Sequence, residues 1–378
     1  MDLARRQYCH ALEATNKAIS TPHGAVSDQT LASVLLLCHF ERTAHDRFSP
    51  SYSWTNHLQG AAKLLLLRGV QPLHTPVGRQ LFVQVGINLR ASAIERGERI
   101  PDAFLELRRQ ANGLMAEDMN PMLALVPVTD ALVELKATMR EGGFEDDAAV
   151  IDAALRVDRT ARELPVGFPS HWRYEVQPGG HNQAEIPVHR YAEPCVAQLW
   201  NAIRMIRIYL NQLIYKRTVR QIDEQNIMGD GSTPLQLTEL RNTAQGIVHI
   251  MALEICASVP QFVHHIAVEN DTASTTYFSP IQSSSVGASA GFLLRPLSLA
   301  GGTPLAPAAA QQFAAKYLPL VRSKAWLPAE VGVAELFKVA TTEGHSVRDD
   351  WYASTLFDYV MRANDQSFPE RLHMYQVF

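Results

Sequence analysis

Residues 196–213, VAQLWNAIRMIRIYLNQL, have the strongest periodicity in the chain. Their apolar side chains recur every three or four residues, at Val196, Leu199, Ile203, Ile206, Leu210 and Leu213. This spacing places the side chains on one face of an α-helix, and Pro194 suits the start of such a helix. We therefore expect a long central helix whose apolar face is buried.

The same helical spacing continues over most of the chain, whereas strict alternation over five or more residues is hard to find. Ser27 is placed to cap the next helical pattern, and Gly69 ends the pattern of residues 54–68. Prolines that fit the first turn of further helices are Pro76, Pro101 and Pro121. Pro127 is expected to kink the third of these helices. The sequence predicts an all-α, multi-helix scaffold around the central helix.

Residues 164–188 interrupt the helical pattern with several prolines and glycines around an isolated Trp172. We expect an ordered loop here between the helical halves 1–163 and 189–378, which together form one compact unit. Long ordered loops often have a function. Later in the chain the pattern predicts a mobile loop at 270–285 and helices near 286–299, 307–321, 328–341 and 349–362.

The charge balance argues against direct binding of nucleic acid. The 378 residues contain 34 Lys and Arg against 38 Asp and Glu, a net charge of −4, so the chain has no positive field to hold a polyanion. Uninterrupted apolar stretches are far shorter than the roughly 18 residues of a membrane span, and charged residues stand where a signal peptide would be apolar. We expect a protein of the nucleus or cytoplasm, neither secreted nor in a membrane.

The sequence contains no recognisable metal or cofactor motif. Its four cysteines lie far apart in apolar helical contexts, which is typical of reduced core thiols. Neither Cys-x-x-Cys nor His-Glu-x-x-His is present, and the glycine-rich nucleotide loops and Gly-x-Ser-x-Gly are missing too. We expect neither a metal nor a cofactor.

Several segments form an ordered set along most of the chain. They are residues 31–41 (LASVLLLCHFE), 54–69 (WTNHLQGAAKLLLLRG), 100–101 (IP), 169–174 (PSHWRY), 197–211 (AQLWNAIRMIRIYLN), 255–260 (ICASVP) and 291–297 (GFLLRPL). This set resembles the regulatory (middle homology) region of fungal zinc-cluster transcription factors. The resemblance implies a helical regulatory module with a small apolar metabolite as its ligand, acting as a homodimer or with a transcription-factor partner.

Two features depart from that family. The six closely spaced cysteines of its zinc-cluster DNA-binding element are missing. Arg295 stands where the family usually has an aromatic residue before Pro296 and Leu297. We expect either a fragment of a longer regulator or a stand-alone derivative that does not touch DNA.

The central helix carries a second, polar stripe beside its apolar one, formed by Trp200, Arg204, Arg207 and Asn211. A partly buried pair of arginines needs carboxylate or carbonyl partners. One interpretation is an internal salt-bridge network, with partners such as the helices of Glu239 and Glu254. The other is recognition of an acidic or carbonyl group on a ligand.

Two further groups of residues could contribute to a ligand site. Trp54 and His57 begin a helix face of small residues, which either packs closely or places the imidazole in a pocket. Aromatic and imidazole side chains also gather in or beside the Pro/Gly-rich loop, which either covers an apolar cavity or is held by one buried Trp; they are His171, Trp172, Tyr174, His181, His189 and Tyr191. The ligand-binding candidates are Trp54, His57, Trp172, His189, Tyr191, Trp200, Arg204 and Arg207.

Three classes of function fit these observations. The first is a regulatory module that binds a small apolar metabolite in an internal pocket and controls secondary-metabolite genes through a partner. The second is a cofactor-free enzyme of fungal secondary metabolism, a cyclase or isomerase such as a Diels-Alder pericyclase on a terpene or polyketide, because a shaped dry pocket with a few donors leaves no motif. The third is an interaction protein without a ligand.

Overall fold

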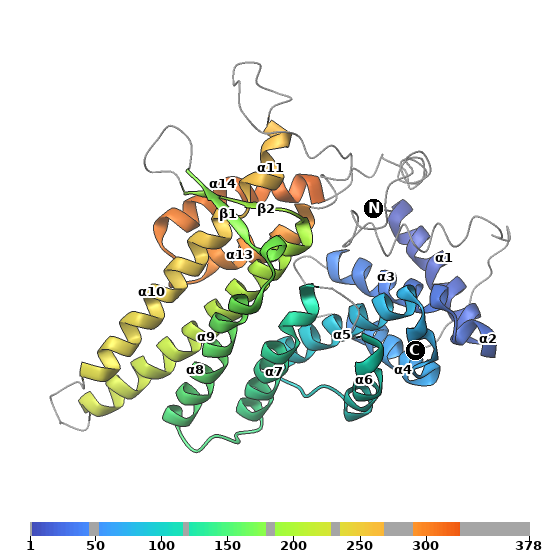
Figure 1. Ribbon diagram of the computed structural model, residues 1–378, viewed down its shortest axis with the longest axis horizontal. Coiled ribbons are helices and arrows are strands. Elements are labelled where there is room, and N and C mark those ends of the chain that lie inside the picture. Colours follow the sequence, from blue (N-terminus) through green and yellow to red (C-terminus); the bar gives the residue numbers. More distant parts are fainter. Residues whose placement is uncertain are drawn as a thin grey trace. The chain divides into compact units, whose positions relative to one another are not determined.

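The computed structural model describes residues 2–44, 53–115, 121–178, 186–227, 235–267 and 290–325. Its backbone contacts divide these residues into two units (Figure 1), the first ending before Pro121 and the second beginning there. Each unit is described by itself below. The loop expected between two helical halves lies inside the second unit, because the helix before it packs along the helix after it.

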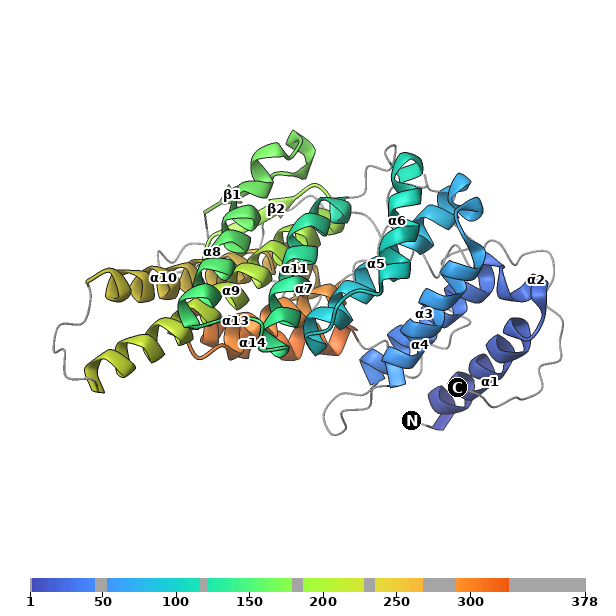
Figure 2. The same cartoon turned by 90° about the horizontal axis from the view of Figure 1, so that it is seen from below.

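The first unit consists of helices. They are α1 (Asp2–Ile19), α2 (Pro22–Ala25), α3 (Asp28–Ala44), α4 (Ser53–Arg68), the 3-10 turn η1 (Gln71–His74), α5 (Pro76–Arg96) and α6 (Asp102–Met115). Helices α3 and α4 lie side by side and α1 packs on α3 (Figure 2). The Ser27 hydroxyl accepts a hydrogen bond from the Thr30 N–H at 3.1 Å, and Gly69 follows α4 with a φ of 62°. Both predicted helix boundaries are confirmed.

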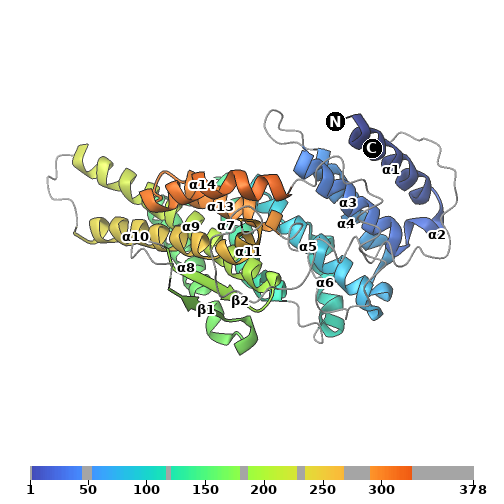
Figure 3. The same cartoon turned by 90° about the horizontal axis from the view of Figure 1, so that it is seen from above.

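The second unit is built around a layer of long helices. Its first elements are η2 (Pro121–Leu125), α7 (Val126–Arg140), α8 (Asp147–Glu163), α9 (Pro194–Ile227) and α10 (Leu235–Ala257). Helix α9 lies between α8 and α10 and packs against both (Figure 1). The later elements are α11 (Pro260–Ala267), η5 (Ala290–Leu293), α13 (Leu294–Gly302) and α14 (Ala308–Ala325). Helices α13 and α14 pack against each other and against α10 (Figure 3).

Helix α9 confirms the expectation of a long central helix, since it runs for 34 residues. Most of its predicted apolar stripe is buried, from Val196 and Leu199 to Leu210. Val196 joins a core with side chains of α10, α11, α13 and α14, whereas Leu199 and Ile203 pack with Leu125 and Phe168. The stripe is therefore the feature that fixes the position of α9 in this unit.

A short β-hairpin accompanies the helices. After the turns η3 (Leu164–Gly167) and η4 (Ser170–Trp172), strand β1 (Tyr174–Gln177) pairs antiparallel with β2 (Val188–Tyr191), and Tyr174 stands opposite Tyr191. The ordered segment expected at 164–188 thus contains a strand and leads into a second. The described residues otherwise form helices, which confirms the all-α fold.

Two other expectations, the kink at Pro127 and the burial of all four cysteines, are not confirmed in full. Pro127 does not kink a helix, because α7 begins at Val126 and a proline in the first turn displaces no helical hydrogen bond. Among the four free cysteines Cys9 is exposed, while the other three are buried as expected. The helices expected at 328–341 and 349–362 and the loop at 270–285 lie outside the described residues.

One stretch of the second unit has the length and composition of a membrane span. It covers Leu235–Val263, and 56% of the most apolar part of this stretch is buried inside the protein. A core helix of a soluble protein has the same properties, so the stretch is weak evidence for a membrane. The absence of a membrane-spanning segment stays a prediction.

Candidate functional site

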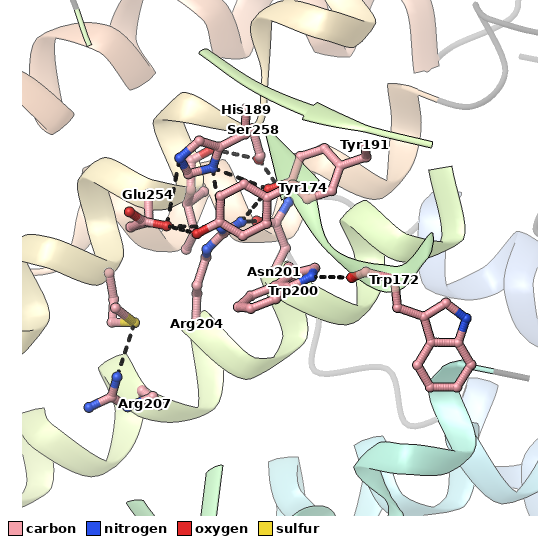
Figure 4. A network of polar contacts seen from close by, with 12 residues as sticks. Trp172, Tyr174, His189, Tyr191, Trp200, Asn201, Arg204, Arg207, Glu254 and Ser258 are labelled. Atoms are coloured by element: carbon pink, nitrogen blue, oxygen red, sulfur yellow. Dashed lines mark hydrogen bonds and ion pairs between the residues drawn. The ribbon is translucent and has the colours of Figure 1, made fainter. Parts of the chain in front are cut away.

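Arg204 of α9 is the centre of a buried polar group in the second unit (Figure 4). Its side chain is only 2% exposed, yet both terminal nitrogens of its guanidinium have partners. Nη1 donates to the Tyr191 hydroxyl at 2.7 Å and to Oδ1 of Asn201 at 2.9 Å. Nη2 donates to Oε2 of Glu254 at 3.0 Å and lies 3.2 Å from Nδ1 of His189. A buried guanidinium needs such saturation to offset its desolvation.

We call Arg204 with Tyr174, His189, Tyr191, Asn201 and Glu254 the Arg204 cluster. The β-hairpin supplies Tyr174, His189 and Tyr191, whereas α9 and α10 supply the other members. The Tyr174 hydroxyl donates to Oε2 of Glu254 at 2.9 Å, the oxygen that also accepts from Arg204. The backbone of Tyr191 exchanges two hydrogen bonds with the Gln261 amide, at 2.7 and 2.9 Å. The cluster therefore fastens the hairpin to the helices.

Aromatic rings surround the guanidinium. Its central carbon lies 5.1 Å from the centroid of Tyr174 and 5.6 Å from that of Trp200, within cation–π range. The indole N–H of Trp200 donates to the backbone carbonyl of Trp172 at 2.8 Å. The Trp172 ring itself points away from Arg204 (Figure 4) and meets Phe168 edge-on. Trp172 thus contributes its backbone to this region, and its ring packs elsewhere.

Burial and neighbouring charges shift the pKa values of several members of the Arg204 cluster. Burial, and next the neighbouring Arg204, lower the pKa of His189 to about 4, so its imidazole is neutral at pH 7. Burial raises the pKa of Tyr191 to about 12, although Arg204 opposes this. Burial lowers the pKa of Arg204, but Tyr191 and Glu254 outweigh it and the net shift is upward. At neutral pH Arg204 is therefore charged, whereas His189 and Tyr191 are neutral.

Arg207 lies one turn further along α9 and belongs to a different contact. Its Nε and Nη2 donate to the two oxygens of Asp158 on α8, at 2.9 and 3.3 Å. Asn211 also donates to Asp158, at 3.0 Å. The two arginines of the stripe therefore pair with carboxylates on the two helices beside α9, Arg204 with Glu254 of α10 and Arg207 with Asp158 of α8. This is the arrangement that the salt-bridge interpretation requires.

His57 of α4 is part of a second polar group, in the first unit. The Tyr8 hydroxyl of α1 donates to Oε1 of Glu41 on α3 through a short hydrogen bond, and burial raises the pKa of Tyr8. His57 Nε2 lies 3.1 Å from the Tyr8 oxygen and 3.2 Å from Oε1 of Glu41. We call these three residues the Glu41 cluster. Trp54 lies a turn before His57, and its carbonyl accepts from the Cys38 thiol at 3.4 Å.

The eight predicted ligand residues are divided between the two units. In the second unit His189, Tyr191, Trp200 and Arg204 come together, Trp172 joins them through its backbone carbonyl, and Arg207 pairs with Asp158; Trp54 and His57 belong to the first unit. Glu254 was named as a salt-bridge partner, whereas Asp158, Tyr8 and Glu41 were missed. The sequence does contain an indication of Glu41. It lies three residues after Cys38, so it places a carboxylate on the otherwise apolar face of α3. Ligand binding by any of these residues stays a prediction.

The described residues also include one surface hollow, but no metal-binding group. A hollow of about 340 Å³ lies against α6, lined by Leu105, Arg108, Arg109 and Asn112, none of them a predicted ligand residue. In the described part of the chain, no three His, Cys, Asp or Glu side chains are grouped so that they could hold a metal ion. The strongest polar constellations are therefore the Arg204 and Glu41 clusters.

The saturation of Arg204 limits the chemistry of its cluster. All donors described on Nη1 and Nη2 already meet an acceptor of the chain. A ligand oxygen can reach the guanidinium only by displacing one of these partners. Glu254 is the partner nearest to solvent, since its side chain is 30% exposed and that of His189 is 1% exposed.

Comparison with known proteins bears on the first unit. Residues 1–88 match the family model of the fungal specific transcription factor domain. The chain matches no curated protein and no solved structure at a significant level. The matched residues include the Glu41 cluster and end before the second unit. Over residues 1–88, this chain is therefore similar to the fungal specific transcription factor domain, the family that its resemblance predicted.

Proposed function

We propose that this chain is a regulatory module of fungal transcription that responds to a small apolar metabolite and controls secondary-metabolite genes through a protein partner. The observation that carries the proposal is the match of residues 1–88 to the fungal specific transcription factor domain. That match supports a regulatory role; the metabolite, the genes and the partner are the proposed parts.

A partner protein is proposed because the chain's own electrostatics do not favour DNA. Its net charge is −4, and affinity for duplex DNA rests largely on Lys and Arg that neutralise phosphates. A second copy of the chain or a transcription factor with its own DNA-binding element would supply that contact. The proposed place of action is the nucleus.

The proposed metabolite site is the solvent side of the Arg204 cluster. Trp200 and Tyr174 give an apolar surface, and Arg204 gives a charged donor beneath it. A carbonyl or carboxylate oxygen on an apolar ligand would take the place of Oε2 of Glu254, whose side chain could move into solvent. Because Tyr174 also donates to Glu254, this exchange would loosen the hairpin and so change the surface offered to the partner.

A reporter assay tests the regulatory role. The chain is tethered to a heterologous DNA-binding domain in a fungal host, and reporter output is compared with that of the DNA-binding domain alone. We expect a change of several fold in either direction. Output equal to that of the DNA-binding domain alone, from a chain shown to be folded and nuclear, would contradict the proposal.

A binding assay tests the ligand site separately, with benzoate as the probe and tryptophan fluorescence as the signal. Glu254→Gln removes the competing charge and should tighten benzoate binding about tenfold, the factor that 1.4 kcal/mol represents. Arg204→Gln should abolish binding, whereas Arg190→Gln, on the exposed side of β2, should leave it unchanged. Equal responses of the wild type and Arg204→Gln would place the ligand elsewhere.

The cyclase or isomerase alternative gains no support from the geometry. A substrate carbonyl would reach Arg204 only by displacing Glu254, as the proposed metabolite would, and no described contact adds a second donor for catalysis. The alternative stays a prediction, to be tested by incubating the chain with linear terpene or polyketide precursors.

A further inference from the structure

The Glu41 cluster leaves half of a buried carboxylate without a partner. Both neighbouring polar groups, the Tyr8 hydroxyl and His57 Nε2, lie against Oε1 of Glu41. Oε2 is buried as well, but no described residue gives it a hydrogen bond. The Glu41 side chain is only 10% exposed, so bulk water does not substitute for a partner. An unsatisfied buried acceptor costs about 1–3 kcal/mol, more when charged, so a donor from outside the described residues is called for.

The charge of the cluster indicates which kind of donor would fit. Tyr8 is neutral, because the raised pKa of its hydroxyl keeps the proton on. No described Lys or Arg forms an ion pair with Glu41, in contrast to Glu254, which faces Arg204. A buried carboxylate with an incomplete set of donors is stabilised most by a group that brings both an N–H and a positive charge. A protonated amine has both properties.

The surroundings favour an amine that carries an apolar group. The rings of Tyr8 and Phe40 stack with their centroids 4.9 Å apart and their planes at 18°. This ring pair lies beside the carboxylate, since Phe40 precedes Glu41 on α3 and Tyr8 donates to it. Aromatic faces attract both apolar carbon and cations.

From this geometry we propose that the Glu41 cluster is a binding site for the protonated amine of a small organic molecule. The ammonium donates to Oε2 of Glu41, while Tyr8 and His57 hold Oε1 and so fix the plane of the carboxylate. The attached apolar group lies against the Tyr8 and Phe40 rings. Because α1, α3 and α4 each supply one member, an occupied site joins three helices of the first unit. The proposal is independent of the ligand proposed for the Arg204 cluster.

Three matched probes test the proposal on the full chain by calorimetry and thermal unfolding. Phenethylammonium has both the charge and the N–H donors. Phenethyl trimethylammonium keeps the charge without a donor, and 2-phenylethanol keeps a donor without the charge. We expect saturable binding and a raised unfolding temperature with phenethylammonium, and affinities at least tenfold weaker for the other two. Methylammonium, the smallest probe, should also stabilise the chain, at higher concentration.

Variants then assign the response to Glu41. Glu41→Gln keeps the size of the side chain and removes its charge, and should weaken phenethylammonium binding at least tenfold. Glu106→Gln, at an exposed glutamate of α6 in the same unit, should bind like the wild type. Tyr8→Phe removes the hydroxyl that holds Oε1 and should weaken phenethylammonium binding measurably, so it tests the site even if Glu41→Gln does not fold.

Two results would overturn the proposal. One is the lack of any response to both phenethylammonium and methylammonium, which would mean that a water molecule alone satisfies Oε2. The other is equal binding of the three matched probes, or unchanged binding by folded Glu41→Gln, which would mean that only an apolar surface is being measured.

Discussion

The Arg204 and Glu41 clusters are built from the same kinds of residue but treat their carboxylates differently. In each, tyrosine, histidine and glutamate meet in the interior of a helical unit. Oε2 of Glu254 accepts from Arg204 and Tyr174, with His189 3.8 Å away. In the Glu41 cluster, by contrast, one oxygen has two neighbours and the other has none among the described residues. The comparison teaches that hydrogen-bond saturation, more than residue type, separates a cluster that a ligand can contact directly from one in which a ligand must first displace a partner.

The largest expected effect is the loss of the cation at the centre of the saturated cluster. Arg204→Met should lower the free energy of unfolding of the second unit by about 3–5 kcal/mol, because it leaves buried acceptors without their charged partner. Chemical denaturation followed by circular dichroism measures this. Arg190→Met on the exposed side of β2 is the control and should cost less than about 0.5 kcal/mol. A loss below about 1 kcal/mol for Arg204→Met would remove the distinction between the clusters.

Asp158 provides the next test, because it serves Arg207 and Asn211 at once. Asp158→Asn keeps one acceptor oxygen but removes the charge that Arg207 faces, so we expect a loss of about 2–3 kcal/mol in the same measurement. The matched control is Asp152→Asn on the exposed face of α8. Similar losses for the two variants would show that the α8–α9 ion pair contributes little.

The pH dependence of the free energy of unfolding should show that the His189 imidazole of the Arg204 cluster is buried and neutral. Because the pKa of His189 is about 4 when folded and near its ordinary 6.5 when unfolded, the unfolded chain binds the extra proton between these values. Stability is therefore complete above pH 6.5 and falls toward pH 4, by an amount on the order of 2 kcal/mol. His189→Gln should flatten this part of the profile relative to His171→Gln, an exposed histidine of η4. Parallel profiles for the two variants would contradict the burial of a neutral imidazole.

The smallest effect is expected at the unsaturated cluster. Glu41→Gln removes a charge but also a buried oxygen that lacks a donor, so the two consequences oppose each other. The free energy of unfolding of the first unit should change by about 1 kcal/mol or less. Calorimetric unfolding in a buffer free of amines provides the measurement. A loss as large as that of Arg204→Met would mean that Oε2 has a partner inside the protein.

How far the sequence predicts this molecule depends on whether a feature is local. The helix α9 follows from one stripe of residues, and the ends of α3 and α4 follow from Ser27 and Gly69. The β-hairpin was missed because each strand has four residues, too few to show an alternating pattern. Its position is set by tertiary contacts, such as those of Tyr191 with Gln261 and Arg204.

The candidate sites show the same limit. A buried Arg204 needs a carboxylate partner, and Glu254 could be named because it lies on another predicted helix. Arg207 pairs with Asp158 because of how α8 and α9 are aligned. No local sequence pattern specifies this alignment. The free oxygen of Glu41 depends on tertiary geometry alone, since it results from Tyr8 and His57 both lying against the other oxygen.

The Arg204 cluster also constrains the order in which the second unit can form. Tyr174 and Glu254 are 80 residues apart in the chain, and Arg204 and Glu254 are 50 apart. During synthesis the hairpin and the first part of α9 emerge before the carboxylate that neutralises Arg204, and contacts between distant residues form slowly. Until α10 has been made, Arg204 must stay hydrated. Docking of the hairpin is therefore a late event in folding, and its tyrosines are the residues whose fluorescence and protease resistance should change last.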